Sequence, residues 1–288
     1  MTIHNPAAAF FASPAARGIA ALLRGLQRVS PNLGTRVAMG LFFTPVPTKW
    51  LARSRAVPRP WVELQLPFEG GHISVWQRED IEPGMPKVLL THGWAGDAQQ
   101  MRPLADALAQ AGFEPVLLDL PAHGRSSGLR SNLYQWVRAL FAVTARFGPW
   151  EGVVAHSLGT LALSHALARG LPAHRAVLVA LAPAPWQFLR WFAQAMGTGE
   201  SLAARMRGRF EQREGVSLGH FEPAWLAERV EQPTLIVHDR GDVTAPIVSS
   251  ETLLAGLPAG KLHVTEGLGH RRLLNDPGVM RHVCDHLS

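Results

Sequence analysis

Short apolar runs alternate with longer segments of helical periodicity along most of the chain. The runs predict strands at 62–66, 72–76, 87–91, 115–119, 152–156, 176–181, 233–238 and 261–265. The segments between them predict helices at 97–111, 131–146, 158–169, 246–256 and 271–287. This alternation is typical of an α/β protein with a mostly parallel central sheet flanked by helices. The first two strands flank Gly70 and Gly71 and are expected to form an antiparallel hairpin.

Two segments depart from the alternation. We therefore divide the chain into a partly helical arm at 1–60, a core at 61–182 and 233–288, and a small helical cap inserted at 183–232. The cap segment is rich in aromatic residues and methionine, with Trp186, Trp191 and Phe192 as candidate pocket residues. Such side chains either line an apolar acyl or alcohol pocket or only bury the helices of the cap.

Composition predicts one large hydrophobic core and chemistry that uses neither a metal nor another cofactor. The chain has 288 residues, of which 47% are hydrophobic and 17% charged, and its single cysteine, Cys284, excludes an internal disulfide. A lone cysteine suits a reducing compartment, so a cytoplasmic location is expected. No cluster of Cys and His has metal-ligand spacing and no glycine-rich phosphate loop is present, so we expect neither a metal nor another cofactor.

The positive charge of the chain is concentrated in the arm. The net charge is +6, yet the first sixty residues carry eight basic residues and no acidic one before Glu63. Ile19, Leu22, Leu23, Leu26 and Val29 recur at helical spacing, with Arg17, Arg24 and Arg28 on the opposite face. Such a helix packs on the protein body or lies on anionic lipid as a peripheral membrane contact. No nucleic-acid motif accompanies the charge, so nucleic acid is not an expected partner.

The candidate chemistry begins where the strand at 152–156 ends. Ser157 follows an apolar strand and precedes a helix-forming run, with small residues, Ala155 and Gly159, two positions on either side. This is the pattern of a nucleophile elbow, the sharp strand-to-helix turn that presents a serine hydroxyl above a sheet, with Ala155 in place of the usual first glycine.

An activated serine needs a general base and an acid that orients it, in the chain order Ser, Asp, His. Asp242 follows the predicted strand 233–238 within a polar turn, and Asp239 is its rival in the same turn. His270 follows the last predicted strand, between the bend at Gly267 and Gly269 and the last helix. We therefore predict Ser157 as nucleophile, His270 as base and Asp242 as the orienting acid.

Backbone donors for an oxyanion are expected from two turns. The apolar run at 87–91 ends in His92-Gly93-Trp94, a glycine-bearing turn whose Trp94 N–H would join the Leu158 N–H behind the nucleophile. His92 and His156, next to these turns, are candidates for the substrate pocket, although His156 more often packs inside such an elbow.

The combined pattern resembles the α/β-hydrolase fold superfamily. The resemblance rests on His92-Gly93-Trp94, on Asp119 to Ser126, on Ala155 to Gly159, on Gly241-Asp242 and on Gly267 to His270, and it covers roughly 61–288. It implies a serine hydrolase, most simply one that cleaves a small-molecule carboxylic ester through an acyl-enzyme. Thioester cleavage and acyl transfer use the same residues, and a non-catalytic ligand-binding or membrane-associated protein on this scaffold is the remaining alternative.

Overall fold

The computed structural model describes residues 14–45 and 52–288, and for 14–16 only the backbone. Lys49 of the basic arm lies outside the described residues. The chain forms two compact units. The helical unit consists of Met1–Thr44 and Pro183–Glu222, and the sheet unit consists of Pro45–Ala182 and Pro223–Ser288.

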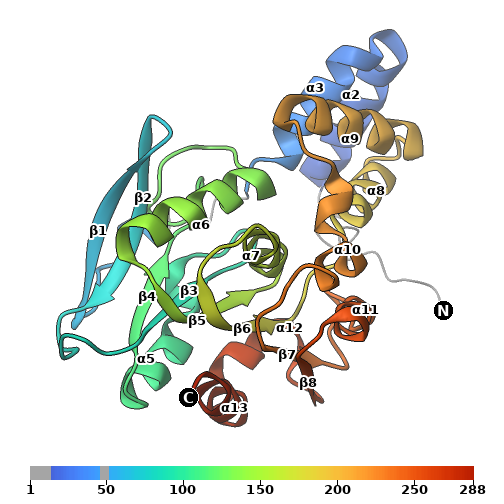
Figure 1. The fold of residues 1–288 in the computed structure, drawn as a ribbon. Coiled ribbons are helices and arrows are strands. Elements are labelled where there is room, and N and C mark those ends of the chain that lie inside the picture. Colours follow the sequence, from blue (N-terminus) through green and yellow to red (C-terminus); the bar gives the residue numbers. More distant parts are fainter. Residues whose placement is uncertain (1–13, 46–51) are drawn as a thin grey trace. The chain divides into compact units, whose positions relative to one another are not determined.

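The sheet unit is built on an eight-stranded sheet of order β1-β2-β4-β3-β5-β6-β7-β8 (Figure 1). The strands are β1 Trp61–Phe68, β2 Gly71–Arg78, β3 Lys87–Thr91, β4 Glu114–Leu118, β5 Trp150–His156, β6 Ala173–Val179, β7 Thr234–Asp239 and β8 Gly260–Thr265. The hairpin β1–β2 and the pair β2–β4 are antiparallel, and all other neighbours are parallel. The predicted mostly parallel sheet with an antiparallel entry hairpin is confirmed.

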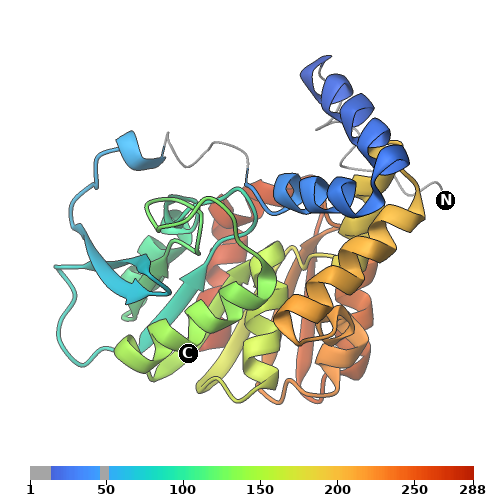
Figure 2. The ribbon, with the colours of Figure 1, turned by 90° about the horizontal axis from the view of Figure 1, so that it is seen from above.

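Helices cover both faces of this sheet. They are α5 Arg102–Gln110, α6 Leu133–Phe147, α7 Leu158–Ala168, α10 Pro223–Ala227, α11 Val248–Gly256 and α13 Pro277–Leu287. Helices α5 and α13 lie on one face, and α6 and α7 lie on the other (Figures 1 and 2). The strands in the middle of the sheet are mostly apolar because both of their faces are covered; Val88, Leu89 and Leu90 of β3, for example, have no exposed surface.

Two predicted helices are interrupted. The segment 97–111 forms a short 3-10 turn at Ala98–Gln100 and then α5, which begins at Arg102 with a proline in its first turn. Asp97 stands at the start of this turn, but its side chain makes no capping hydrogen bond. Instead, the Ala98 N–H donates to Asp119 Oδ1 at 2.7 Å, so a residue after β4 satisfies this turn. The last predicted helix likewise divides into α12 Gly269–Arg272, a 3-10 turn and α13, which starts at Pro277.

The helical unit contains α2 Pro14–Val29, α3 Pro31–Phe42, α8 Pro185–Ala195, α9 Glu200–Glu214 and the 3-10 turn Leu218–Phe221. Ring contacts join the two segments: the centroids of Phe42 and Phe192 are 5.4 Å apart, and those of Phe43 and Phe210 are 5.9 Å apart. The sequence pattern treats the arm and the cap separately, whereas the structure groups 1–44 with 183–222.

Candidate active site

Ser157 occupies the turn between β5 and α7. Its backbone has φ 53° and ψ −128°, a conformation that is strained for any residue except glycine and that is expected of a nucleophile elbow. The turn is also tight, because a Cβ atom on Gly159 would lie 2.4 Å from the carbonyl oxygen of His92. Ser157 is partly exposed, unlike His156 before it.

His270 reaches this serine from the loop after β8. Gly267 and Gly269 have φ of 80° and 64°, left-handed values that let the chain turn sharply before the histidine. The imidazole Nε2 lies 2.9 Å from Ser157 Oγ. The side chain is 13% exposed, so the ring is held within the protein with one edge open.

Asp242 contacts the other ring nitrogen. Its Oδ2 accepts a hydrogen bond from His270 Nδ1 at 2.7 Å, while Oδ1 accepts from the N–H groups of Thr244 and Ala245 at 2.8 and 2.9 Å. Burial by itself would raise the pKa of this carboxyl, but the hydrogen bond and charge of His270 and the backbone donors together lower the pKa below its ordinary value. The carboxylate therefore stays ionised and fixes which nitrogen of His270 carries its proton.

Asp239, the rival acid, is used elsewhere. Its Oδ2 accepts from Thr265 Oγ1 at 2.9 Å and from the Leu268 N–H at 2.8 Å, and its Oδ1 accepts from the Gly241 N–H at 2.9 Å. These bonds tie the loop that carries Asp242 to the loop that carries His270. The structure thus brings Ser157, His270 and Asp242 together and gives Asp239 a supporting place beside them.

The turn after β3 lies directly against the serine. A Cβ atom on Gly93 would lie 2.7 Å from Ser157 Cβ and 3.3 Å from Ser157 Oγ, so only glycine leaves room for the hydroxyl. Trp94 follows this glycine, and Leu158 is the first residue of α7, where backbone N–H groups lack partners within the helix. Both remain the predicted donors to an oxyanion beside Ser157.

Known proteins share the fold that positions these residues. A family model described as serine aminopeptidase, S33, matches residues 85–218. An esterase from Pyrococcus furiosus superposes with a TM-score of 0.60 at 17% identity, covering 79% of this chain and 91% of that chain. The chain has the α/β-hydrolase fold.

Two further solved structures have the same fold. A CIB-like hydrolase from Thermoplasma acidophilum has a TM-score of 0.59 at 15% identity, covering 79% of this chain and 97% of that chain. A bacterial membrane phospholipase A has a TM-score of 0.61 at 16% identity, covering 93% of this chain and 94% of that chain. No curated protein matches the chain.

The two histidines predicted for the pocket are both buried. His92 has no exposed surface; its Nε2 accepts from the Leu120 N–H at 3.1 Å, and its Nδ1 therefore donates to the Gly93 carbonyl at 2.7 Å. His156 is 3% exposed, and its Nε2 donates to the backbone carbonyl of His270 at 2.9 Å. Burial lowers the pKa of His92 to about 4 and, with the charge of His270, that of His156 to about 3, so both rings stay neutral.

No feature of the sequence points to the hydrogen bond between the His156 side chain and the backbone carbonyl of His270. Trp94 packs within an aromatic cluster of the sheet unit, with ring centroids 5.0 Å from His123 and 5.7 Å from Trp136. Its ring is partly exposed.

The candidate pocket residues of the cap belong to the helical unit. Trp191 and Phe192 are 4% exposed and pack inside it, whereas Trp186 is partly buried with Arg207 over its ring at 5.5 Å. The role of all three in substrate binding stays a prediction.

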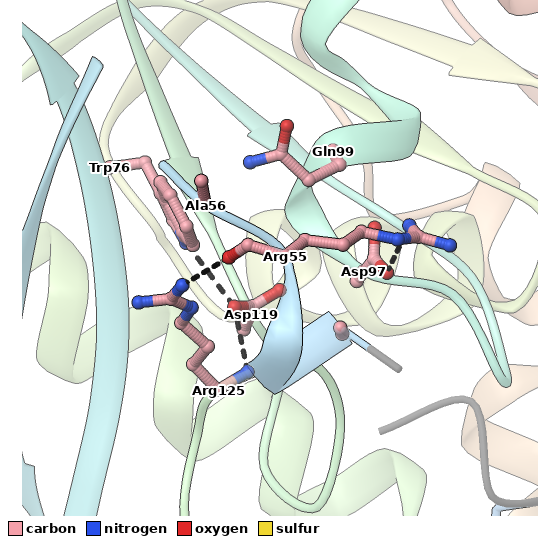
Figure 3. Close-up of a pocket in the computed structure, with 8 residues that line it drawn as sticks. Arg55, Ala56, Trp76, Asp97, Gln99, Asp119 and Arg125 are labelled. Carbon is pink, nitrogen blue, oxygen red and sulfur yellow. Dashed lines mark hydrogen bonds and ion pairs between the residues drawn. The ribbon is translucent and has the colours of Figure 1, made fainter. Parts of the chain in front are cut away.

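A small pocket in the sheet unit lies around Asp119 (Figure 3). Arg55, Trp76, Asp97 and Arg125 line it, and it has room for about one water molecule. Asp119 Oδ2 accepts hydrogen bonds from Trp76 Nε1 and the Arg125 N–H, and burial raises the pKa of its carboxyl to about 6. These bonds brace the loops after β3 and β4, which gives the pocket a structural role. Among the described residues, no three His, Cys, Asp or Glu side chains gather as metal ligands would.

Proposed function

We propose that this α/β-hydrolase is a serine hydrolase that cleaves a carboxylic ester. The observation that carries the proposal is the unbroken chain of hydrogen bonds from Ser157 Oγ through the His270 ring to Asp242 Oδ2, at 2.9 and 2.7 Å. This is the arrangement in which a histidine activates a serine hydroxyl and a carboxylate orients the histidine.

In the proposed reaction, Ser157 Oγ attacks the acyl carbonyl while His270 Nε2 takes its proton. Asp242 keeps the proton of Nδ1 in place and stabilises the imidazolium that forms. The negative oxygen of the tetrahedral intermediate accepts hydrogen bonds from the N–H groups of Trp94 and Leu158. His270 then protonates the leaving alcohol, and a water molecule activated by the same histidine releases the acid from Ser157.

Three likenesses support an ester as the substrate class. The solved structures with this fold include the Pyrococcus furiosus esterase, a lipase from Acinetobacter baumannii and the bacterial phospholipase A, all of which are named for ester substrates. The matching family model is named for an aminopeptidase, so an amide bond is a second candidate. Thioester cleavage and acyl transfer would use the same three residues.

A fluorophosphonate probe tests the nucleophile whichever acyl group the enzyme accepts. We expect labelling at Ser157 alone, located by mass spectrometry, and none in the Ser157→Ala variant. A folded wild-type protein that takes no label, or takes it at another serine, would overturn the proposal.

A substrate panel then tests the bond that is cleaved. It pairs p-nitrophenyl esters of increasing acyl length with acyl thioesters and aminoacyl arylamides, and a competing alcohol reports acyl transfer. We expect the esters to be hydrolysed fastest, with free acid as the main product. Preference for the arylamides would point to the peptidase alternative, and a dominant transesterified product would point to an acyltransferase.

A further inference from the structure

Helix α2 presents an apolar face that no other described part of its helical unit covers. Five of the nine large apolar side chains that are exposed lie on α2 and α3: Ile19, Leu22, Val29, Leu33 and Leu41. Leu22 is 62% exposed and Val29 is 88% exposed. Exposed apolar side chains that gather in this way mark a contact site more often than scattered ones do.

The same helix is firmly held on its other face. Ala20 and Leu23 are buried, and Arg24 Nη1 donates to the Met196 carbonyl at 3.2 Å. Arg205 of α9 bonds to the side chains of Gln27 and Thr35. One side of α2 is thus fixed to its unit, and the apolar stripe beyond it keeps a defined orientation.

The open side of α2 has space around it. A Cβ atom on Gly18 or Gly25 would meet no atom within 4 Å, whereas one on Gly34, where α3 turns back on α2, would lie 2.6 Å from Gln27 Nε2. The N-terminal end of α2, in dark blue, extends past the other helices of its unit (Figure 2). Of the apolar stripe on α2, Leu23 is buried, whereas Ile19, Leu22 and Val29 are exposed.

The charged side chains of α2 and α3 are all positive. Arg17, Arg28 and Arg36 are exposed on α2 and α3, and no acidic residue precedes Glu63. A helix with exposed apolar side chains on one face and exposed arginines on the other matches the two layers of a bilayer surface, acyl chains below anionic phosphates. A second copy of the chain would present the same positive charge, so the two faces would repel each other.

We propose that the exposed face of α2, with Leu33 of α3, docks on anionic membrane surfaces. Ile19, Leu22 and Val29 enter the upper acyl region, and Arg17, Arg28 and Arg36 contact lipid phosphates. The helix lies along the surface, since in 14–45 and 52–288 every helix falls short of the length and apolarity that crossing a bilayer requires. The docking does not depend on the chemistry of Ser157, so it goes beyond the proposed function.

Co-sedimentation of the full chain with vesicles tests this proposal. We expect strong binding to phosphatidylcholine vesicles that contain phosphatidylglycerol and weak binding to phosphatidylcholine alone. The Leu22→Gln/Val29→Gln variant should bind about tenfold more weakly because two apolar anchors are lost. Replacing Arg17 and Arg28 by Gln should weaken binding about fivefold for each arginine, and added salt should weaken the wild type in the same way.

Matched control variants come from the sheet unit. Leu129 and Val248 are 71% and 58% exposed, so Leu129→Gln/Val248→Gln removes similar apolar surface elsewhere. Arg130→Gln/Arg146→Gln removes the same charge from exposed positions. We expect both controls, and Ser157→Ala, to bind like the wild type.

Three results would overturn the proposal. They are absence of wild-type binding, equal binding by the Leu22→Gln/Val29→Gln variant and the wild type, and a wild-type dimer that this variant dissociates without any lipid binding. Because Ser157→Ala keeps the docking face, an inactive protein that still binds vesicles separates failure of the proposed function from failure of this inference.

Discussion

His156 Nε2 donates a hydrogen bond to the backbone carbonyl oxygen of His270 at 2.9 Å, and the two imidazole rings lie 4.8 Å apart. The residue before the candidate nucleophile therefore holds the backbone of the candidate base. We interpret His156 as a positioning residue, because its contact is with the main chain of His270 and its own ring is buried and neutral.

Replacing this histidine separates the hydrogen bond from the packing. His156→Phe keeps a ring but removes the donor, and we expect kcat to fall about ten- to hundredfold, with KM nearly unchanged, because His270 shifts. His156→Gln keeps an N–H donor at a similar position and should restore most of kcat. If both variants lost activity equally, ring packing would be the dominant role of His156.

The serine itself should show a trade between activity and stability. Ser157→Ala should lower turnover by about 10⁶, the typical cost of losing a nucleophile, while the protein keeps its melting temperature. Ser157→Gly should lose as much activity but gain about 1 kcal/mol of stability, since glycine adopts φ 53° without strain. Ester hydrolysis and thermal melts of the two variants test this, and a less stable Ser157→Gly would contradict the strain argument.

Substitutions of Asp242 and Asp239 should affect kcat and melting temperature differently. Asp242→Asn should lower kcat by about 10⁴, because the amide no longer stabilises the imidazolium, with a small change in melting temperature. Asp239→Asn should lower the melting temperature through its lost loop contacts and reduce kcat less. The measurement is kcat and melting temperature for both variants. A larger kcat loss in Asp239→Asn would show that the choice of acid is wrong.

The effect of a glycine-to-alanine substitution on the free energy of unfolding should depend on the space around the glycine. A Cβ on Gly159 would meet the His92 carbonyl at 2.4 Å, so Gly159→Ala should destabilise the protein by about 2 kcal/mol or more. Gly208 in α9 has open space around it, and Gly208→Ala should stabilise by about 0.5–1 kcal/mol. Urea unfolding of both variants measures these changes in the free energy of unfolding. An equal change in the two variants would contradict the assignment of the Gly159→Ala effect to steric crowding.

The buried His156 should make stability depend on pH. Burial and the charge of His270 lower its pKa in the folded state to about 3, below the ordinary value of 6.5, so below 6.5 only the unfolded chain takes up the proton. Its contribution is complete above about pH 6.5 and is lost as pH falls toward about 3. Relative to His156→Gln, the wild type should lose on the order of 2 kcal/mol between about pH 7 and about pH 4.5.

Urea melts across this range measure that difference. Asp119 has the opposite effect, because its raised folded pKa, about 6, makes stability fall as pH rises from 3.8 toward 6. Both proteins retain Asp119, so its contribution cancels in the comparison. Parallel pH profiles for wild type and His156→Gln would contradict the assignment of a neutral buried ring.

Much of the sheet unit is predictable from the sequence because its signals are local. Each buried strand is a short apolar run, and the order of Ser157, Asp242 and His270 places each side chain after a strand. The break between Ala98–Gln100 and α5 is not local, since it depends on Asp119, 21 residues later. The grouping of the arm with 183–222 depends on contacts such as Arg205 to Thr35, 170 residues apart, which no periodicity reveals.

The choice between the two acids shows the same limit. Asp239 and Asp242 are in one polar turn, and both follow a buried strand. Only the path of the loop after β8 decides which carboxylate meets His270 Nδ1 and which accepts from Thr265 and Leu268.

The chain leaves the sheet unit between β6 and β7 to form the segment Pro183–Glu222, and this affects how the protein folds during synthesis on the ribosome. When Ala182 has emerged, strands β1 to β6 can pair, and β6 is then an unpaired edge strand of the sheet. Its residues Ala176, Val177 and Val179 have no exposed surface in the finished protein. Strand β7 can pair with β6 only after the whole segment Pro183–Glu222 has been synthesised. At this stage the nascent chain contains Ser157 but not yet Asp242 or His270, so it is inactive. Its unpaired edge strand β6 makes it prone to aggregation, which a chaperone would prevent.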